Sequence, residues 1–169
     1  GIEKIPSAYI IHATGELNAF AVKIARRRMI VFFAELIEVL VEGEKLDELR
    51  AIAAHELTHV RLKHINYFFF LMPFRILPFL GTMLSRAQEL SADRGALAIA
   101  KNHHIVSQAL LKLIAGKFVV GTVDINEYLE QSYHEGGFFI WLAKITSTHP
   151  PVPKRIAMLR AYASEPQGY

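Results

Sequence analysis

Five consecutive residues, His55-Glu56-Leu57-Thr58-His59, constrain this chain more than any other stretch. An α-helix makes one turn in about 3.6 residues, so side chains four positions apart lie on one face. If the segment is helical, both histidines can direct an imidazole nitrogen at the same metal ion. Glu56 then lies beside them, within reach of a water molecule bound to that metal. Two neutral nitrogen ligands and a carboxylate base are what zinc hydrolysis requires, so the motif predicts a zinc peptidase site.

The residues around this motif predict a helix over 44–64, the active-site helix. Acidic residues stand near its start and basic residues near its end, which is the polarity that the helix dipole favours. Its apolar residues recur at helical spacing, so one face should be buried. These positions are Leu46, Leu49, Ile52, Ala53, Leu57 and Val60.

A catalytic zinc ion needs a third protein ligand and keeps a fourth position for water. The chain has no cysteine, so His, Asp or Glu must hold any metal. Glu89 and Asp93 are four residues apart in a second helical pattern, residues 86–101, and share a face. Glu89 is the candidate third ligand, and Asp93 can accept the N–H of a ligating histidine. The alternative is that both are surface residues paired with Arg86 or Arg94.

The remaining pattern predicts a small N-terminal sheet over 5–33, followed by helices to the end, with C-terminal helices in 102–163. The fold class is therefore α+β, mainly α, in one domain over 1–169. Asn18, Ala19 and Phe20 belong to an extended segment that could form an edge strand over the cleft, where a substrate peptide would pair with its backbone. The chain begins with Gly rather than Met, so we expect an excised domain.

Residues 65–84 are unusually apolar, and the metal site limits what they can do. His59 and Glu89 must reach one ion, so a single membrane crossing between them is excluded. A hairpin would have arms of about 15 Å, roughly half of the hydrocarbon thickness. Three options remain open: a hairpin that dips into the membrane interface with Arg75 at its tip, an apolar surface for a partner, or core packing.

Overall composition narrows the class of partner. The net charge of +3, from 19 basic and 16 acidic residues, is too small to predict nucleic-acid binding, and the arginines at 26–28 fit a solvated hairpin end. Hydrophobic residues make up 52% of the chain, and the mean hydropathy is +0.25. These values favour a membrane surface or an apolar partner.

Several landmarks, in order along most of the chain, resemble the gluzincin metallopeptidases, and within them the family that contains HtpX and the CAAX prenyl protease. The resemblance implies a zincin-like, mainly helical catalytic domain with one zinc ion (Zn2+), ligated by His55, His59 and Glu89, and with Glu56 as base. It also implies work on peptides or misfolded proteins at a membrane. The matching segments are Leu17–Ala21, Asp47–Val60, Glu89–Arg94, Ser147–Pro151 and Arg155-Ile156.

In the predicted mechanism, Glu56 takes a proton from the metal-bound water and returns it to the leaving amine. A further donor should stabilise the oxyanion, and the candidates are His149, His134, Tyr133 and Arg155. For His149 a loop-fixing role is an equal alternative. The other histidines, including His64 at a helix end, are expected at the surface.

Three functions from different classes follow from these features. The first is a zinc endopeptidase acting on peptides or unfolded proteins, with a role in membrane-protein quality control. The second is an inactive zinc-binding relative that binds unfolded proteins or membranes. The third is a membrane-associated structural domain in which the motif is incidental. For location we expect a membrane-associated protein, with its soluble catalytic domain on the cytoplasmic side and contacts to a membrane surface or membrane protein through 65–84. The alternative is a cytoplasmic protein.

Overall fold

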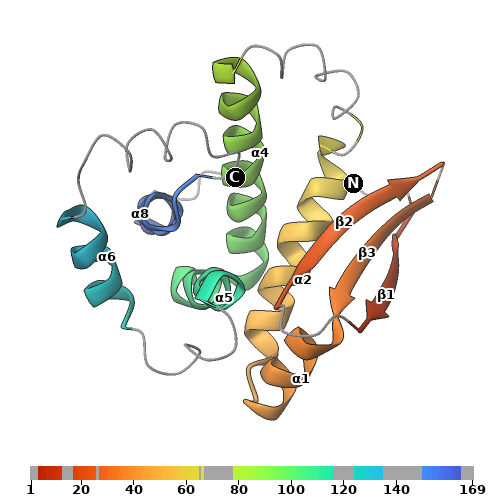
Figure 1. Cartoon of the computed structure of the whole chain (residues 1–169), viewed down its shortest axis with the longest axis horizontal. Coiled ribbons are helices and arrows are strands. Elements are labelled where there is room, and N and C mark those ends of the chain that lie inside the picture. The colour runs from red at the N-terminus through yellow and green to blue at the C-terminus, as the bar shows by residue number, and fades with distance from the viewer. Residues whose placement is uncertain are drawn as a thin grey trace.

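The computed structural model describes residues 4–12, 17–25, 27–64, 66, 78–115, 124–134 and 150–164. Within these ranges the chain is mainly helical with one small N-terminal sheet (Figure 1). The predicted fold class, α+β and mainly α, is therefore confirmed.

Three strands form the sheet, and they lie within the predicted range 5–33. They are β1 (Ser7–Ile11), β2 (Ala19–Ile24) and β3 (Arg27–Phe33). The order is β1-β3-β2, with β2 antiparallel and β1 parallel to β3. Ala25 has a positive φ of 53° in the tight connection between β2 and β3. Among the described residues, this topology leaves β2 as an edge strand, paired with β3 on one side.

Two helices follow β3 directly. Helix α1 (Ala34–Glu42) ends at Gly43, and α2 (Leu46–Arg61) carries the five-residue motif. The predicted helix over 44–64 is longer than α2 at both ends. Glu44 and Lys63 both have positive φ values, 53° and 59°, which end a right-handed helix. The chain therefore turns sharply just after α2.

Four more helices are described in the rest of the chain. Helix α4 begins at Pro78 rather than near residue 86, because proline is well tolerated at the first position of a helix. Part of the predicted apolar hairpin, 78–84, therefore belongs to α4. The helices are α4 (Pro78–Ala100), α5 (His103–Ala115), α6 (Ile125–His134) and α8 (Val152–Ser164).

Helix α2 lies between the sheet and the C-terminal helices, and it contacts both α4 and β2 (Figure 1). The approach of α4 to α2 is close at Gly95: a Cβ atom there would lie 2.1 Å from the Thr58 hydroxyl oxygen. The main core surrounds α2 and is built from buried aliphatic side chains. They include Leu36, Leu40, Ile52, Val60, Ala96, Leu97, Leu110 and Leu159.

A second, smaller core joins the C-terminal helices. Leu111 of α5, Ile125 and Leu129 of α6, and Val152 and Ile156 of α8 form it. These contacts fix the start of α8 against α5.

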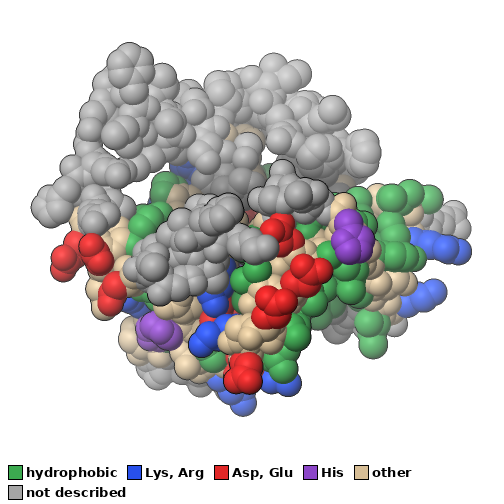
Figure 2. Space-filling model, turned by 60° about the horizontal axis from the view of Figure 1, so that its bottom comes forward, with side chains coloured by type: hydrophobic (Ala, Val, Ile, Leu, Met, Phe, Trp, Pro, Cys, Tyr) green, Lys and Arg blue, Asp and Glu red, His purple; other side chains and the backbone are tan. Residues whose placement is uncertain are grey.

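The sheet also has apolar side chains at the surface. Every residue of β1 is exposed, and Ile10 and Ile24 are each more than half exposed. Figure 2 shows hydrophobic side chains on the side of the molecule where Figure 1 places the sheet. The same face also carries acidic, basic and histidine side chains.

Some predictions fall outside the described residues. These are most of the apolar hairpin (65 and 67–77), His149 and its loop, and the side chains of Tyr133 and His134. Among the described residues, no helix has the length and apolar character needed to cross a bilayer.

Candidate metal centre

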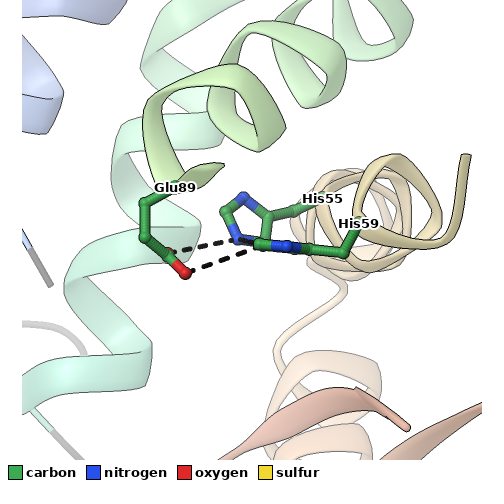
Figure 3. Close-up of side chains that lie close together, drawn as sticks. All are labelled: His55, His59 and Glu89. Carbon is green, nitrogen blue, oxygen red and sulfur yellow. Dashed lines mark hydrogen bonds and ion pairs between the residues drawn. The ribbon is translucent and has the colours of Figure 1, made fainter. Parts of the chain in front are cut away.

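Three side chains from two helices converge at the middle of the fold (Figure 3). His55 and His59 come from α2, one helical turn apart, and Glu89 comes from the facing side of α4. The two histidine Nε2 atoms are 3.1 Å apart. Oε2 of Glu89 lies 3.6 Å from Nε2 of His55, and Oε1 lies 3.7 Å from Nε2 of His59. The structure thus brings together the three residues that the sequence proposed as ligands.

These separations fit a single ion. Donor atoms at zinc–nitrogen and zinc–oxygen bond lengths in a tetrahedron are about 3.3 Å apart. The two histidine nitrogens are 3.1 Å apart, and a different Glu89 oxygen faces each of them, at 3.6 and 3.7 Å, so these separations lie on both sides of that value. Within the described part of the chain, His55, His59 and Glu89 form the group of donors that could hold a metal. Two imidazoles and a carboxylate are a donor set typical of catalytic zinc.

Asp93 lies behind His55 on the side away from the other ligands. Its Oδ1 is 3.0 Å from Nδ1 of His55, and the carboxylate is almost completely buried, at 1% exposure. Burial alone would raise the pKa of Asp93, but the contacts with Arg155 and His55 outweigh it and lower the pKa. Asp93 is therefore an anion in ion-pair contact with Nδ1 of His55, although the geometry of this contact is not that of a hydrogen bond. A small rotation of the imidazole ring would let Asp93 accept the Nδ1–H, which would leave Nε2 free for a metal.

Arg155 of α8 holds Asp93 from the opposite side. Its Nε and Nη2 donate hydrogen bonds of 2.7 and 2.6 Å to the two carboxylate oxygens, and Nη1 lies 3.3 Å from Glu89. Arg155 is itself buried, at 7% exposure. It was a candidate oxyanion donor, but two of its three nitrogens already bind Asp93. The arginines predicted as alternative partners of Asp93, Arg86 and Arg94, do not take this place.

Glu56 is buried beside the two histidines, at 9% exposure. Burial raises its pKa to about 7, an effect that is opposed by positive charge on His55. The backbone of Ala21 in β2 hydrogen-bonds to this carboxylate, and this contact also lowers the pKa of Glu56. The glutamate of the motif therefore lies between the histidines and the edge strand.

The two histidines differ in their protonation. Burial lowers the pKa of His55, but the contacts with Asp93 and Glu89 outweigh this and raise it to about 9. Burial and the neighbouring His55 lower the pKa of His59 to about 4. In the metal-free protein the positive charge of the histidine pair therefore lies on His55, and His59 is neutral.

A cavity of about 1060 Å³ opens onto this centre. It is bounded by β2, by α2 and by α5, and His55, Glu56, His59 and Glu89 all line it. The predicted substrate residues Asn18, Ala19 and Phe20 line it too. The backbone of Asn18 continues the pairing of β2, since its carbonyl accepts the Phe33 N–H at 3.0 Å. The edge strand and the metal ligands therefore face one space.

His64 was predicted to be a surface residue, and that prediction is wrong. It is partly buried, it lines the cavity, and its Nδ1 lies 3.0 Å from Nδ1 of His59. The two histidines are five positions apart, which is not a helical spacing, so periodicity gave no signal. The turn at Lys63 brings His64 back against the site.

Comparison with known proteins decides the family. The model of peptidase family M48 matches residues 1–75 and 65–163, which together cover most of the chain. The chain belongs to peptidase family M48. The resemblance found in the sequence motifs is thereby confirmed at the level of the family.

Several relatives are similar to this M48 chain over most of its length. A plastoglobule-localized metallopeptidase 48 of Arabidopsis thaliana is 28% identical over 172 residues, covering 88% of the chain and 46% of the relative. Protease HtpX homologs of Helicobacter pylori and Helicobacter acinonychis are 26% and 28% identical, covering 92% and 91% of the chain. The chain spans 60% of the length of each of these two proteins.

Proposed function

We propose that this chain is the catalytic part of a zinc-dependent endopeptidase with a zincin-like site. The observation that carries the proposal is the convergence of His55, His59 and Glu89 around a space that fits one ion, with Glu56 beside it. Membership of a peptidase family supports the same conclusion. A nitrogen-rich donor set with one carboxylate favours zinc over magnesium or calcium, which prefer oxygen ligands.

His55, His59 and Glu89 would hold the ion. A zinc ion held there would supply a water molecule with a pKa lowered towards about 7 and would polarise the scissile carbonyl. Glu56 accepts the proton from the attacking water and delivers it to the leaving amine. Asp93 keeps the proton of His55 on Nδ1, and Arg155 holds Asp93 in place through two hydrogen bonds.

An extended peptide would bind along β2. Because β3 is the one strand that pairs with β2 in the described part of the chain, the other edge of β2 can offer backbone N–H and C=O groups to a substrate. Asn18, Ala19 and Phe20 begin this edge and line the cavity that contains the ligands. We assign these three residues to substrate binding, and His149 to oxyanion stabilisation or to fixing its loop.

We extend the proposal to peptides or unfolded proteins at a membrane, with quality control of membrane proteins as the role. The support for this part is the apolar sequence of residues 65–84, which suits a membrane surface or a membrane-protein partner. The catalytic domain would lie on the cytoplasmic side. Liposome flotation of the wild type and of Phe69→Ser/Phe70→Ser tests it, and equal flotation would refute a membrane contact there.

The proposal is tested by comparing wild type, Glu56→Gln and Glu42→Gln in a casein or fluorogenic-peptide assay. Glu42 is an exposed glutamate at the end of α1, so its variant controls for the change of charge. We expect Glu56→Gln to lose about 10²–10⁴-fold in activity while it retains zinc, and Glu42→Gln to match the wild type. Equal cleavage by wild type and Glu56→Gln would refute the mechanism. Zinc binding without any cleavage by the wild type would favour the inactive zinc-binding relative.

A further inference from the structure

His64 contacts a candidate zinc ligand on the side away from the ion. Its Nδ1 is 3.0 Å from Nδ1 of His59, and the two rings are nearly perpendicular, at 75°. The other nitrogen of His64, Nε2, lies 3.4 Å from the hydroxyl oxygen of Ser91 on α4. That hydroxyl donates a hydrogen bond of 2.8 Å to the carbonyl of Gln88. Four groups from α2, the turn after it and α4 therefore form a connected chain.

The local backbone holds His64 in this place. Lys63 has a φ of 59°, which folds the chain back after the last turn of α2. The turn is then tied to two other elements. Asn66 accepts a hydrogen bond of 2.9 Å from Lys23 of β2, and Ser91 contacts His64 from α4. His64 is thus positioned by contacts on both sides of the site rather than projecting from a free helix end.

The hydrogen bonds in this chain can run in only one direction when His59 binds a metal. His59 faces the other ligands through Nε2, so that nitrogen must keep its lone pair and the neutral ring carries its proton on Nδ1. Nδ1 of His64 must then accept, which puts the His64 proton on Nε2. The Ser91 hydroxyl gives its own proton to Gln88, so its oxygen is free to accept from His64. Each donor therefore meets an acceptor.

We propose that His64 is a positioning residue that fixes the tautomer and ring orientation of His59 for metal binding, with Ser91 fixing His64 in turn. The inference rests on the proposed zinc site and adds a member to it. His64 does for His59 what Asp93 does for His55, but with a neutral acceptor, so it adds no negative charge to the site. His64 is not itself a ligand of the same ion, because it contacts the nitrogen of His59 that points away from Glu89.

Two substitutions test the hydrogen-bond acceptor of His64 and its ring separately. Phenylalanine keeps a ring and removes the acceptor, whereas asparagine places an oxygen near the position of Nδ1 and removes the ring. We expect His64→Phe to weaken zinc binding about 10- to 100-fold in a chelator competition, as the loss of a residue that orients a ligand does. We expect His64→Asn to keep most of the wild-type zinc affinity. Ser91→Ala should lose less zinc affinity than His64→Phe. His104→Phe, at an exposed position of α5, is the matched control and should bind zinc as the wild type does.

The tautomers give a second readout that needs no variant. Long-range ¹H–¹⁵N correlation spectra of the zinc-loaded wild type should show His64 with its proton on Nε2 and His59 with its proton on Nδ1. His64 with its proton on Nδ1, or wild-type zinc affinity in a folded His64→Phe, would overturn the inference and leave the zinc site intact. Absence of zinc binding by the wild type would overturn the proposed function and this inference together.

Discussion

Replacing Gly95 with alanine tests whether the close packing of two helices builds the metal site. His55 and His59 lie on α2, whereas Glu89 and Asp93 lie on α4, so the spacing of these helices sets the ligand geometry. An added Cβ at residue 95 would lie 2.1 Å from Oγ1, 2.6 Å from Cγ2 and 2.8 Å from Cβ of Thr58. Rotation of the Thr58 side chain can move the first two atoms but not its Cβ.

The displacement can be estimated from these contacts. Ordinary contact begins at 3.4 Å, so the helices would have to separate by about 0.6 Å even after Thr58 has rotated. A metal site tolerates deviations of about 0.2 Å in its ligand distances. Overpacking costs about 1–3 kcal/mol, while alanine in place of glycine favours a helix by about 1 kcal/mol. Stability should therefore change little, and zinc affinity is the decisive quantity.

We expect Gly95→Ala to bind zinc at least about tenfold more weakly, which corresponds to about 1.4 kcal/mol. Chelator competition measures the affinity, and thermal unfolding checks the fold. Thr58→Gly in the same background removes all three close atoms and should restore binding. Gly43→Ala is the matched control, because it adds a Cβ at the end of α1, away from the contact between α2 and α4; its nearest neighbour there would be the Val39 carbonyl oxygen at 3.0 Å, and the backbone φ is −80°. Wild-type affinity in Gly95→Ala would refute the argument that this contact sets the ligand geometry.

Four further predictions follow from the buried charges, one helix start and the metal. Arg155→Met should destabilise the protein by about 3–5 kcal/mol in denaturant unfolding, because it leaves the Asp93 carboxylate buried without its partner. Lys112→Met should be destabilising in the same way through Glu48, and the double variant Glu48→Gln/Lys112→Met should recover most of the loss; a double variant no better than the single would show that the ion pair is not the cause. Asp124→Ala should cost about 1 kcal/mol, measured by thermal unfolding, since its carboxylate accepts two N–H groups at the start of α6, and an unchanged midpoint would contradict that capping role. Zinc at 100 times its dissociation constant should stabilise the wild type by about 2.7 kcal/mol, and removal by a chelator should reverse this.

Local periodicity is sufficient to predict the parts of the site that lie on single helices. The four-residue spacing of His55 and His59, and of Glu89 and Asp93, places each pair on one face of its helix. The fold adds that these two faces oppose each other across α2 and α4. The predicted range of the sheet, 5–33, also contains the three observed strands, because β-branched and aromatic residues mark them.

Residues that reach the site from a distance give no such signal. Arg155 contacts Asp93 from 62 residues away, and only the packing of α8 against α4 brings them together. His64 reaches His59 because Lys63 adopts a left-handed conformation, which sequence does not reveal for a lysine. The parallel pairing of β1 with β3 is likewise a tertiary arrangement, since the strands are separated by β2 in the chain. The metal ligands imply one contact between helices, that of Glu89 with the two histidines, but neither the motif nor helical spacing implies the contacts of Arg155 with Asp93 and of His64 with His59.

The most direct test of the central claim is the zinc stoichiometry of purified wild-type protein and of Glu89→Ala, measured by elemental analysis and chelator competition. Glu130→Ala, at an exposed position of α6, is the matched control. The account predicts one zinc ion per chain in the wild type and in Glu130→Ala, and binding weakened at least about tenfold in Glu89→Ala. A wild type without stoichiometric zinc, or a Glu89→Ala variant with unchanged affinity, would contradict it.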